Sequence, residues 1–498
     1  MNHRLHLLAD SVLQPAFAGT TPPDWLRRRL AAGLGGVVLF ARNTPDAETT
    51  AALTAALRAE NPDVVIAADE EGGPVTRVEA ATGSSWPGNA ALGHIDDPAL
   101  TSAVAAEMGG FLAAAGITLD YAPTADVNSD PLNPVIGVRS FSADPAVTAR
   151  HTEAFVRGLQ SAGVAACAKH FPGHWDTRLD SHHDLPVLDL DEDTLHAREL
   201  LPFRAAVAAG VRAVMAGHLV VPCLDPENPA SLSRPVLSGL LREQLGFEGL
   251  IVTDALEMKA VARGSDLPRL AVRAVAAGAD AVCVGSAGAD EATAAALGDA
   301  LVAAVLDGEL PEERLADAAA RVAELAAWHR RARASAGAAE QPGGYAVLGR
   351  EAARRALDVR RNAGAGPELP LDRAPVVVTL NPPVHAALGR HGTWGVAGPL
   401  AELLPGTTAV GLDRAAAAGP ELDSAAADAD RPLVVVVRDA HRLDWADAAL
   451  RRLLRLRPDA VVVEMGWPGP ERPGSIHIAT YGASPVSARA AAELLCGR

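Results

Sequence analysis

The sequence is poor in cysteine and in basic charge, and it contains no long apolar run. Its four cysteines in 498 residues are widely spaced, which is typical of buried thiols in a reducing compartment and fits neither a disulfide framework nor a metal site. The net charge of -17 argues against a nucleic acid or an anionic membrane as partner, since both bind basic surfaces. No run approaches the roughly 20 apolar residues of a membrane span. Because a very short apolar patch flanked by charges is a poor signal peptide, we expect a soluble, cytoplasmic protein.

Lysine is almost absent as well. Lys169 and Lys259 are the only two, and every other basic side chain apart from histidine is arginine. A compact ammonium on a flexible stem fits a small polar ligand in a tight pocket better than a planar guanidinium does. We therefore expect Lys169 to have a function that arginine cannot supply.

The apolar residues, 49% of the chain, are ample for globular cores, and the length indicates two or three domains. Short apolar runs alternate with helical segments in the first two thirds of the chain. This alternation predicts a (β/α)8 TIM-like barrel, with a doubly wound sheet as the alternative. The eight expected strands are Val12–Phe17, Gly36–Phe40, Val64–Ala68, Ile117–Tyr121, Val164–Ala168, Ala213–Ala216, Leu250–Thr253 and Ala281–Val284.

Polar residues at the ends of these runs favour the barrel. They include Asp69-Glu70-Glu71, Asp126, Lys169-His170, His218 and Asp254. Because the C-terminal ends of barrel strands converge on one pocket, we expect these side chains to share a site.

Helix starts are marked by a capping side chain before a proline at the first helical position. The three pairs are Thr44-Pro45, Asp97-Pro98 and Asp144-Pro145. Each of them predicts a helix that begins at its proline.

A smaller part of the chain follows a linker. The helix expected over 312–333 is succeeded by residues 334–344, whose composition is that of a linker. We therefore divide the chain into a barrel domain (1–333), a linker (334–344) and a C-terminal α/β layered domain (345–498). In the last domain we expect helices over 347–361, 446–456 and 486–495, and strands over 376–379, 434–437, 460–464 and 476–481.

The segment from Lys169 to Pro186 concentrates groups that titrate or donate near neutral pH, with four histidines and three aspartates. Such a cluster directly after a buried strand is typical of a catalytic loop. Within it, Asp180 lies two residues before His182 and can fix the tautomer of that ring, which makes a tunable acid/base. The alternative interpretation is that Asp180 and His182 are both solvated side chains of a loop.

Asp254 ends an apolar strand, where a carboxylate is costly to bury unless it is paired or chemically active. It can be a nucleophile or the cap of the following helix, and spacing alone does not decide between them. For Asp69, Arg77 and Arg139 the sequence also leaves two interpretations open, sugar binding and surface salt bridges. A carboxylate accepts paired sugar hydroxyls and a guanidinium clamps an oxygen-rich ligand, but surface salt bridges fit equally well.

Together, these segments resemble glycoside hydrolase family 3, in particular its NagZ-type β-N-acetylglucosaminidases. The most specific piece is KHFPGH with a downstream DSHxxxP, here Lys169–His174 and Asp180–Pro186. The DEEGG segment with Arg77, the NPVIGxRSF segment and the VTDxLEM segment add to it, in the family's order. Three positions depart from the family pattern, namely Trp175, Val138 and Ala255.

The resemblance implies a retaining glycosidase that removes terminal non-reducing β-linked N-acetylglucosamine without a metal or cofactor. Asp254 would be the nucleophile that forms a covalent glycosyl-enzyme, and His182 with its partner Asp180 the acid/base. The implied setting is cell-wall (muropeptide) recycling or chitooligosaccharide use, with a small carbohydrate as the partner molecule. The residues implied to bind the sugar are Asp69, Arg77, Arg139, Lys169 and His170.

Four other readings remain open. A β-N-acetylglucosaminide phosphorylase or a β-glucosidase of the same family would use the same nucleophile. A metal-dependent hydrolase could use the histidines after Lys169 as ligands. A non-catalytic sugar-binding protein would need neither Asp254 nor the Asp180/His182 pair.

Overall fold

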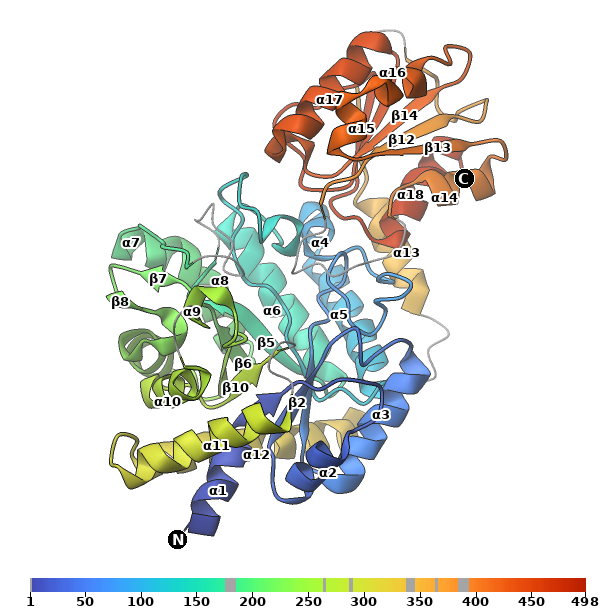
Figure 1. Ribbon diagram of the computed structural model, residues 1–498. Helices are drawn as coiled ribbons and strands as arrows, with labels where there is room; N and C mark the ends of the chain where they lie inside the picture. The colour runs from blue at the N-terminus through green and yellow to red at the C-terminus, as the bar shows by residue number, and fades with distance from the viewer. Residues whose placement is uncertain are drawn as a thin grey trace.

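The computed structural model describes residues 2–174, 185–262, 266–285, 290–336, 345–362, 366–383 and 394–498. Within these residues the chain forms two six-stranded sheets, each with its own helices and its own cores. Figure 1 shows the N-terminal sheet in blue to green and the C-terminal sheet in orange to red.

The N-terminal sheet is parallel and follows the chain in order. A bridge between Val252 and Ala281 leads from its last strand to β10 (Val282–Val284), which pairs in parallel with β1 (Leu13–Pro15). All eight predicted strands are therefore confirmed, most of them shorter than expected. The six strands of the sheet are β2 (Gly36–Leu39), β3 (Val65–Ala68), β4 (Leu119–Asp120), β5 (Ala165–Phe171), β6 (Ala213–Ala216) and β9 (Leu250–Thr253).

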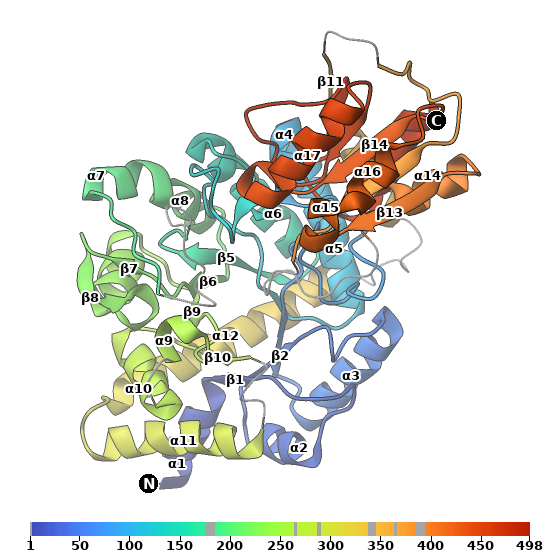
Figure 2. The ribbon, with the colours of Figure 1, turned by 45° about the horizontal axis from the view of Figure 1, so that its top comes forward.

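Both faces of these strands are buried, because alternate residues enter two different cores. Val38, Val65 and Cys167 lie in the inner core, together with residues of the long helix α12 (Glu312–Ala336). Val37, Ile66 and Ala166 lie in the outer core, which the other helices cover (Figure 2). These helices include α1 (Asn2–Ser11), α2 (Asp24–Ala31), α3 (Ala47–Glu60), α4 (Asn89–Ile95), α5 (Pro98–Ala114), α6 (Pro145–Ser161), α8 (Leu200–Ala208), α10 (Leu267–Ala277) and α11 (Glu291–Leu306).

Two of the three predicted helix starts are confirmed. Asp97 and Asp144 cap α5 and α6, and the proline after each is the first helical residue. The prediction at Thr44 is wrong, because α3 begins three residues later and its cap is Asp46, which accepts from the Thr49 backbone N–H at 2.7 Å. The Thr44 hydroxyl instead donates to the carbonyl oxygen of Arg77 at 2.6 Å.

The C-terminal sheet has the strand order β11-β16-β15-β14-β12-β13, with only β11 antiparallel. The five parallel strands are thus doubly wound. The helices α14 (Ala397–Leu403) and α18 (Pro485–Cys496) pack on one face, and α15 (Arg414–Ala418), α16 (Pro420–Ala426) and α17 (Asp444–Leu456) pack on the other. The strands are β11 (Asp358–Arg361), β12 (Val376–Leu380), β13 (Thr408–Leu412), β14 (Leu433–Val437), β15 (Val461–Glu464) and β16 (Ile476–Ala479).

The four strands predicted for this part are confirmed, but β11 and β13 were not predicted. The helix expected over 347–361 is α13 (Tyr345–Arg355), and the prediction is wrong beyond Arg355 because the chain turns there into the edge strand β11. Upstream, α12 continues to Ala336, past the expected linker start at residue 334.

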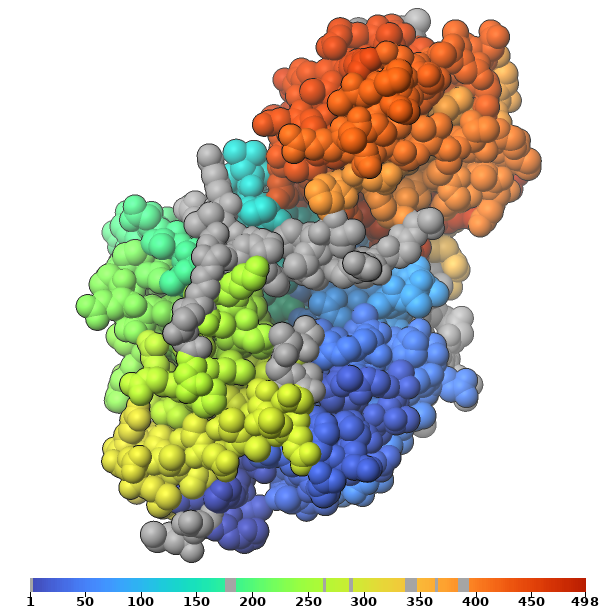
Figure 3. Space-filling view, viewed as in Figure 1, coloured from blue at the N-terminus to red at the C-terminus, as the bar shows by residue number. Residues whose placement is uncertain are grey.

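The C-terminal part packs on the side of the N-terminal part that carries α4 and α5 (Figure 3). Tyr481 stacks on His94 with ring centroids 4.0 Å apart, and Arg355 pairs with Asp97 at 2.8 Å. Residues from α4 and from β16 share one small apolar cluster there. The two parts therefore meet through aromatic, ionic and apolar contacts.

The cysteines and the apolar helices were both the subject of predictions from composition. Cys167 and Cys283 are buried as expected, whereas Cys223 is exposed, so the expectation of a buried thiol is wrong for that residue. In the described part of the chain, no helix is both long enough and apolar enough to cross a membrane.

Candidate active site

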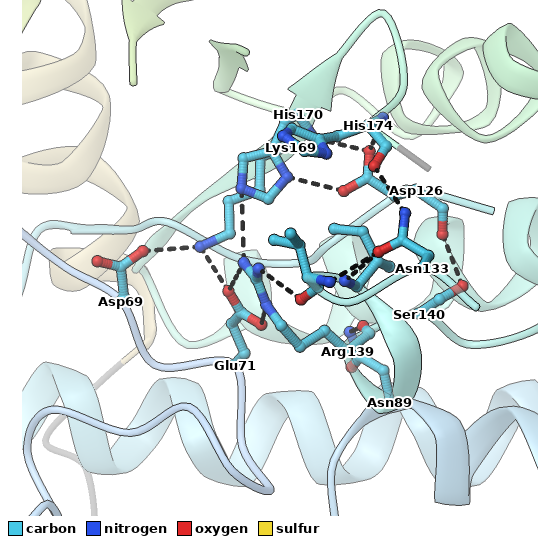
Figure 4. Close-up of polar contacts among 12 residues, drawn as sticks. Asp69, Glu71, Asn89, Asp126, Asn133, Arg139, Ser140, Lys169, His170 and His174 are labelled. Carbon is cyan, nitrogen blue, oxygen red and sulfur yellow. Dashed lines mark hydrogen bonds and ion pairs between the residues drawn. The ribbon is translucent and has the colours of Figure 1, made fainter. Parts of the chain in front are cut away.

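Of the side chains predicted to share a site, five gather at the C-terminal ends of neighbouring strands, namely Asp69, Glu71, Asp126, Lys169 and His170 (Figure 4). Lys169 and His170 belong to the last residues of β5, and Asp69 directly follows β3. Arg139 ends the short 3-10 helix η1 (Gly137–Arg139). The parallel register of β3, β4 and β5 brings these ends together.

Lys169 joins two carboxylates. Its Nζ lies 2.7 Å from Oδ1 of Asp69 and 2.6 Å from Oε1 of Glu71. Glu71 in turn accepts from Arg139 Nε at 2.9 Å and from Arg139 Nη2 at 2.8 Å, a two-pronged pair. Lys169 is 1% exposed and Glu71 is 2% exposed, so this is a buried network.

The network determines the protonation of its members. Burial alone would raise the pKa of the Glu71 carboxyl, but the charges of Arg139 and Lys169 outweigh it and hold that pKa well below its usual value. Burial alone would lower the pKa of Lys169, but Asp69 and Glu71 raise it above its usual value. Glu71 and Lys169 are therefore both charged at neutral pH.

His170 is held by Asp126, which is fully buried. Oδ2 of Asp126 lies 2.7 Å from His170 Nδ1, and Oδ1 accepts from the backbone N–H groups of His170 at 3.1 Å and His174 at 2.8 Å. The other ring nitrogen of His170, Nε2, lies 3.5 Å from Arg139 Nη2. Burial lowers the pKa of His174 to about 4, so that ring is neutral.

Local turns place the guanidiniums. Gly72 and Gly73, with φ of 75° and 60°, turn the chain after Glu71 in a backbone region that favours glycine. Arg77 returns to within 3.8 Å of Asp69. The turn before Arg139 is closed by Asn133, whose Oδ1 accepts from Val135 and Ile136 N–H, both at 2.8 Å.

Asp254 directly follows β9, at the same end of the sheet, and is partly exposed. Its backbone N–H donates to the Ala216 carbonyl at 3.0 Å, and its Oδ1 accepts from Ala255 N–H at 2.8 Å. The next helix, α9 (Lys259–Ala262), begins five residues later, which weakens the reading of Asp254 as its cap. His218, fully buried, contacts the Ala255 carbonyl through Nε2 at 3.0 Å.

Asp180 and His182 lie outside the described residues, as does Trp175. The structure thus brings together Asp69, Arg77, Arg139, Lys169 and His170, and it places Asp254 at the same end of the sheet, after β9, which β6 separates from β5.

Two residues of the network had no predicted role. Glu71 lies in the DEEGG segment, and Asp126 was noted only as a polar residue after a strand. Both could have been identified because each is a carboxylate in an apolar part of the sequence. Burial of a carboxylate costs free energy unless it has cationic or N–H partners. In the described ranges, no group of three or more His, Cys, Asp and Glu side chains is arranged to hold a metal ion.

Known proteins resemble this chain over both its parts. Residues 25–325 match the family model for the glycosyl hydrolase family 3 N terminal domain. "Beta-hexosaminidase A" of Pseudoalteromonas piscicida is 36% identical over 263 residues, which cover 49% of this chain and 44% of that protein, less than half of its length. A "Beta-hexosaminidase" of Stenotrophomonas maltophilia strain K279a is 38% identical over 268 residues, 52% of this chain and 78% of that protein.

Among solved structures, a glycoside hydrolase family 3 beta-N-acetylglucosaminidase from Paenibacillus sp. str. FPU-7 superimposes with a TM-score of 0.86 at 32% identity. This similarity covers 99% of the present chain and 96% of that one.

Proposed function

Because the chain belongs to glycosyl hydrolase family 3, we propose that it is a β-N-acetylhexosaminidase, a retaining enzyme that removes terminal non-reducing β-linked N-acetylglucosamine. The observation that carries this proposal is the charge balance of the buried network. Its two carboxylates, Asp69 and Glu71, face the two cations Lys169 and Arg139. A balanced set of donors and acceptors suits an uncharged, hydroxyl-rich ligand better than an ion.

Asp254 is the proposed nucleophile. A carboxylate at the end of β9 faces the same end of the sheet as the network, and its negative charge would stabilise the positive charge that develops on the sugar ring. Attack by one Asp254 oxygen on the anomeric carbon would break the glycosidic bond and form a glycosyl ester, which water then hydrolyses with overall retention.

His182, partnered by Asp180, is the proposed acid/base. It would give a proton to the departing oxygen in the first step and take one from water in the second. This assignment rests on the DSHxxxP motif, since both residues lie outside the described ranges. Asp69, Arg77, Lys169 and His170 would bind sugar hydroxyls, and Arg139 would complete the binding site.

For the architecture, we propose that the eight N-terminal strands form a closed (β/α)8 barrel. Supporting this, β9 leads to β10 by a bridge and β10 pairs with β1, next to the start of the sheet. The proposed division is a catalytic domain of residues 1–333, a linker of 334–344 and a C-terminal α/β sandwich of 345–498. A cytoplasmic role in muropeptide recycling or chitooligosaccharide use is the proposed setting.

The experiment is release of p-nitrophenol from the β-N-acetylglucosaminide and from the β-glucoside, each with and without inorganic phosphate. Turnover of the aminosugar alone, independent of phosphate, is expected. Equal turnover of both sugars would favour a β-glucosidase, and a requirement for phosphate would favour a phosphorylase. Binding of N-acetylglucosamine without turnover would favour a sugar-binding protein.

A further inference from the structure

The contacts of Asp126 identify one tautomer of His170. Two backbone donors point at Oδ1 of this carboxylate, the N–H groups of His170 and His174, and His170 Nδ1 lies 2.7 Å from its Oδ2. With a carboxylate oxygen as its neighbour, His170 Nδ1 is placed to donate, which assigns the ring proton to Nδ1. In the neutral ring, Nε2 is then a lone-pair acceptor.

The Arg139 guanidinium, on the other side of the His170 ring, requires the same tautomer. His170 Nε2 lies 3.5 Å from Nη2 of Arg139, and a guanidinium can only donate. A proton on Nε2 would therefore point at another N–H. Arg139 cannot turn away easily, because Glu71 holds its Nε and Nη2 at 2.9 and 2.8 Å and the side chain is 6% exposed.

We propose that Asp126 is a positioning residue for the reaction: it fixes His170 as the Nδ1–H tautomer, so that Nε2 stays an acceptor between Arg139 and the bound sugar. This inference rests on the proposed function and deepens it. Asp126 itself is fully buried and acts through His170.

Asp126→Asn tests the tautomer with little change in shape. The amide oxygen can keep both backbone N–H bonds, while the amide N–H₂ group meets His170 Nδ1 with a donor. The ring must then move its proton to Nε2 to accept that bond, which places an N–H against Arg139. We expect kcat/KM for the p-nitrophenyl β-N-acetylglucosaminide to fall on the order of 10²- to 10⁴-fold, as expected for a wrong histidine tautomer in an active site.

Asp120→Asn is the matched control. Asp120 is also a fully buried aspartate near a strand end, and its Oδ1 accepts from the Glu70 N–H at 2.9 Å. Burial raises the pKa of Asp120 well above its usual value and so favours its neutral form, which an amide resembles in charge. This variant is expected to keep kcat/KM within about threefold of wild type, because the amide oxygen can still accept from the Glu70 N–H.

A double-mutant cycle separates positioning from a general structural effect. In a His170→Phe background the ring has no nitrogen to orient, so adding Asp126→Asn should change kcat/KM by less than about threefold. If the loss of kcat/KM in the double variant equals the product of the losses in the two single variants, the proposal is overturned. Urea unfolding of each variant checks that the fold is retained.

The tautomer itself is read directly by two-bond ¹H–¹⁵N spectra of histidine-labelled protein, in which the His170 signals are those missing from His170→Phe. We expect an Nδ1–H ring in the wild type and in Asp120→Asn, and an Nε2–H ring in Asp126→Asn. An Nε2–H or doubly protonated ring in the wild type would overturn the proposal, even if Asp126→Asn does not fold. This readout does not depend on turnover, so it also separates failure of the inference from failure of the proposed function.

Discussion

Glu71→Gln is the substitution that should destabilise the N-terminal part of the chain most clearly. The carboxylate is 2% exposed and contacts both Lys169 and Arg139. Replacing it by an amide leaves two buried cations with one anion fewer. Lys169 keeps Asp69 at 2.7 Å, whereas Arg139 loses the charged pair and at least one of its two contacts to residue 71, because only one atom of the amide accepts.

The magnitude follows from the uncompensated charge. At an effective dielectric constant of about 20, unit charges 4 Å apart interact by about 4 kcal/mol, but desolvation offsets much of that gain in the intact network. Removing one partner of a buried pair costs about 3–5 kcal/mol, because the other charge stays buried. We expect about 3 kcal/mol here, since Lys169 retains one carboxylate.

The assay is urea unfolding at pH 7, followed by tryptophan fluorescence, to which the buried Trp86 of the N-terminal part contributes. The matched control is Glu153→Gln, which removes an exposed carboxylate 2.8 Å from Arg157 and should change the free energy of unfolding by less than about 1 kcal/mol. Equal effects of the two substitutions would refute the reasoning.

The pH dependence of stability gives a second test of Glu71. Its pKa is lowered in the folded state, so its contribution to stability is present above its unfolded pKa of 4.5 and is lost as pH falls below that value. Glu71→Gln should therefore be less sensitive to acid below pH 4.5 than the wild type.

Two further predictions concern Lys169 and His174, and a third concerns Asp254. Lys169→Arg should lower kcat/KM at least 100-fold in steady-state kinetics, because a planar guanidinium does not fit the space of a side chain that is 1% exposed and contacts two carboxylates; an active variant would contradict this. Because the His174 pKa is lowered to about 4 in the folded state, its contribution is present above pH 6.5 and lost as pH falls from 6.5 toward 4. Between pH 6.5 and 4, the free energy of unfolding of His174→Phe should therefore fall by up to about 3 kcal/mol less than that of the wild type, as measured by urea unfolding at each pH. Asp254→Ala should lower kcat on the order of 10⁴-fold, and retention of full activity would exclude it as the nucleophile.

The strands, and the gathering of charged residues at one end of the sheet, could be predicted from the sequence where a pattern is strong. The apolar runs of the parallel strands are buried on both faces, so they stand out as continuous hydrophobic segments. Lys169 could be identified because it is one of only two lysines. Its burial and its two carboxylate partners agree with a role specific to lysine.

The side-chain directions within DEEGG could not be predicted. The three consecutive carboxylates have different sets of partners: Asp69 pairs with Lys169, Glu70 accepts from the backbone N–H of Arg77 at 2.9 Å, and Glu71 pairs with both Lys169 and Arg139. These directions depend on the turn at Gly72 and Gly73, which is set by packing against Pro87 and Gly88.

The edge elements of the C-terminal sheet were missed for a different reason. Residues of β11 and β13 are mostly exposed, so neither strand carries the run of apolar residues that identified the central strands. Thr44 shows a similar limit: its position before a proline is that of a helix cap, yet its hydroxyl bonds to the Arg77 carbonyl instead.

The most direct test of the account is mass spectrometry of wild-type enzyme quenched with acid during turnover of the p-nitrophenyl β-N-acetylglucosaminide. We expect an added N-acetylglucosaminyl group on the proteolytic peptide that contains Asp254, absent from Asp254→Ala. An adduct on another residue would contradict the assignment of Asp254. Retention of configuration without any adduct, together with an active Asp254→Ala, would show that Asp254 is not the nucleophile.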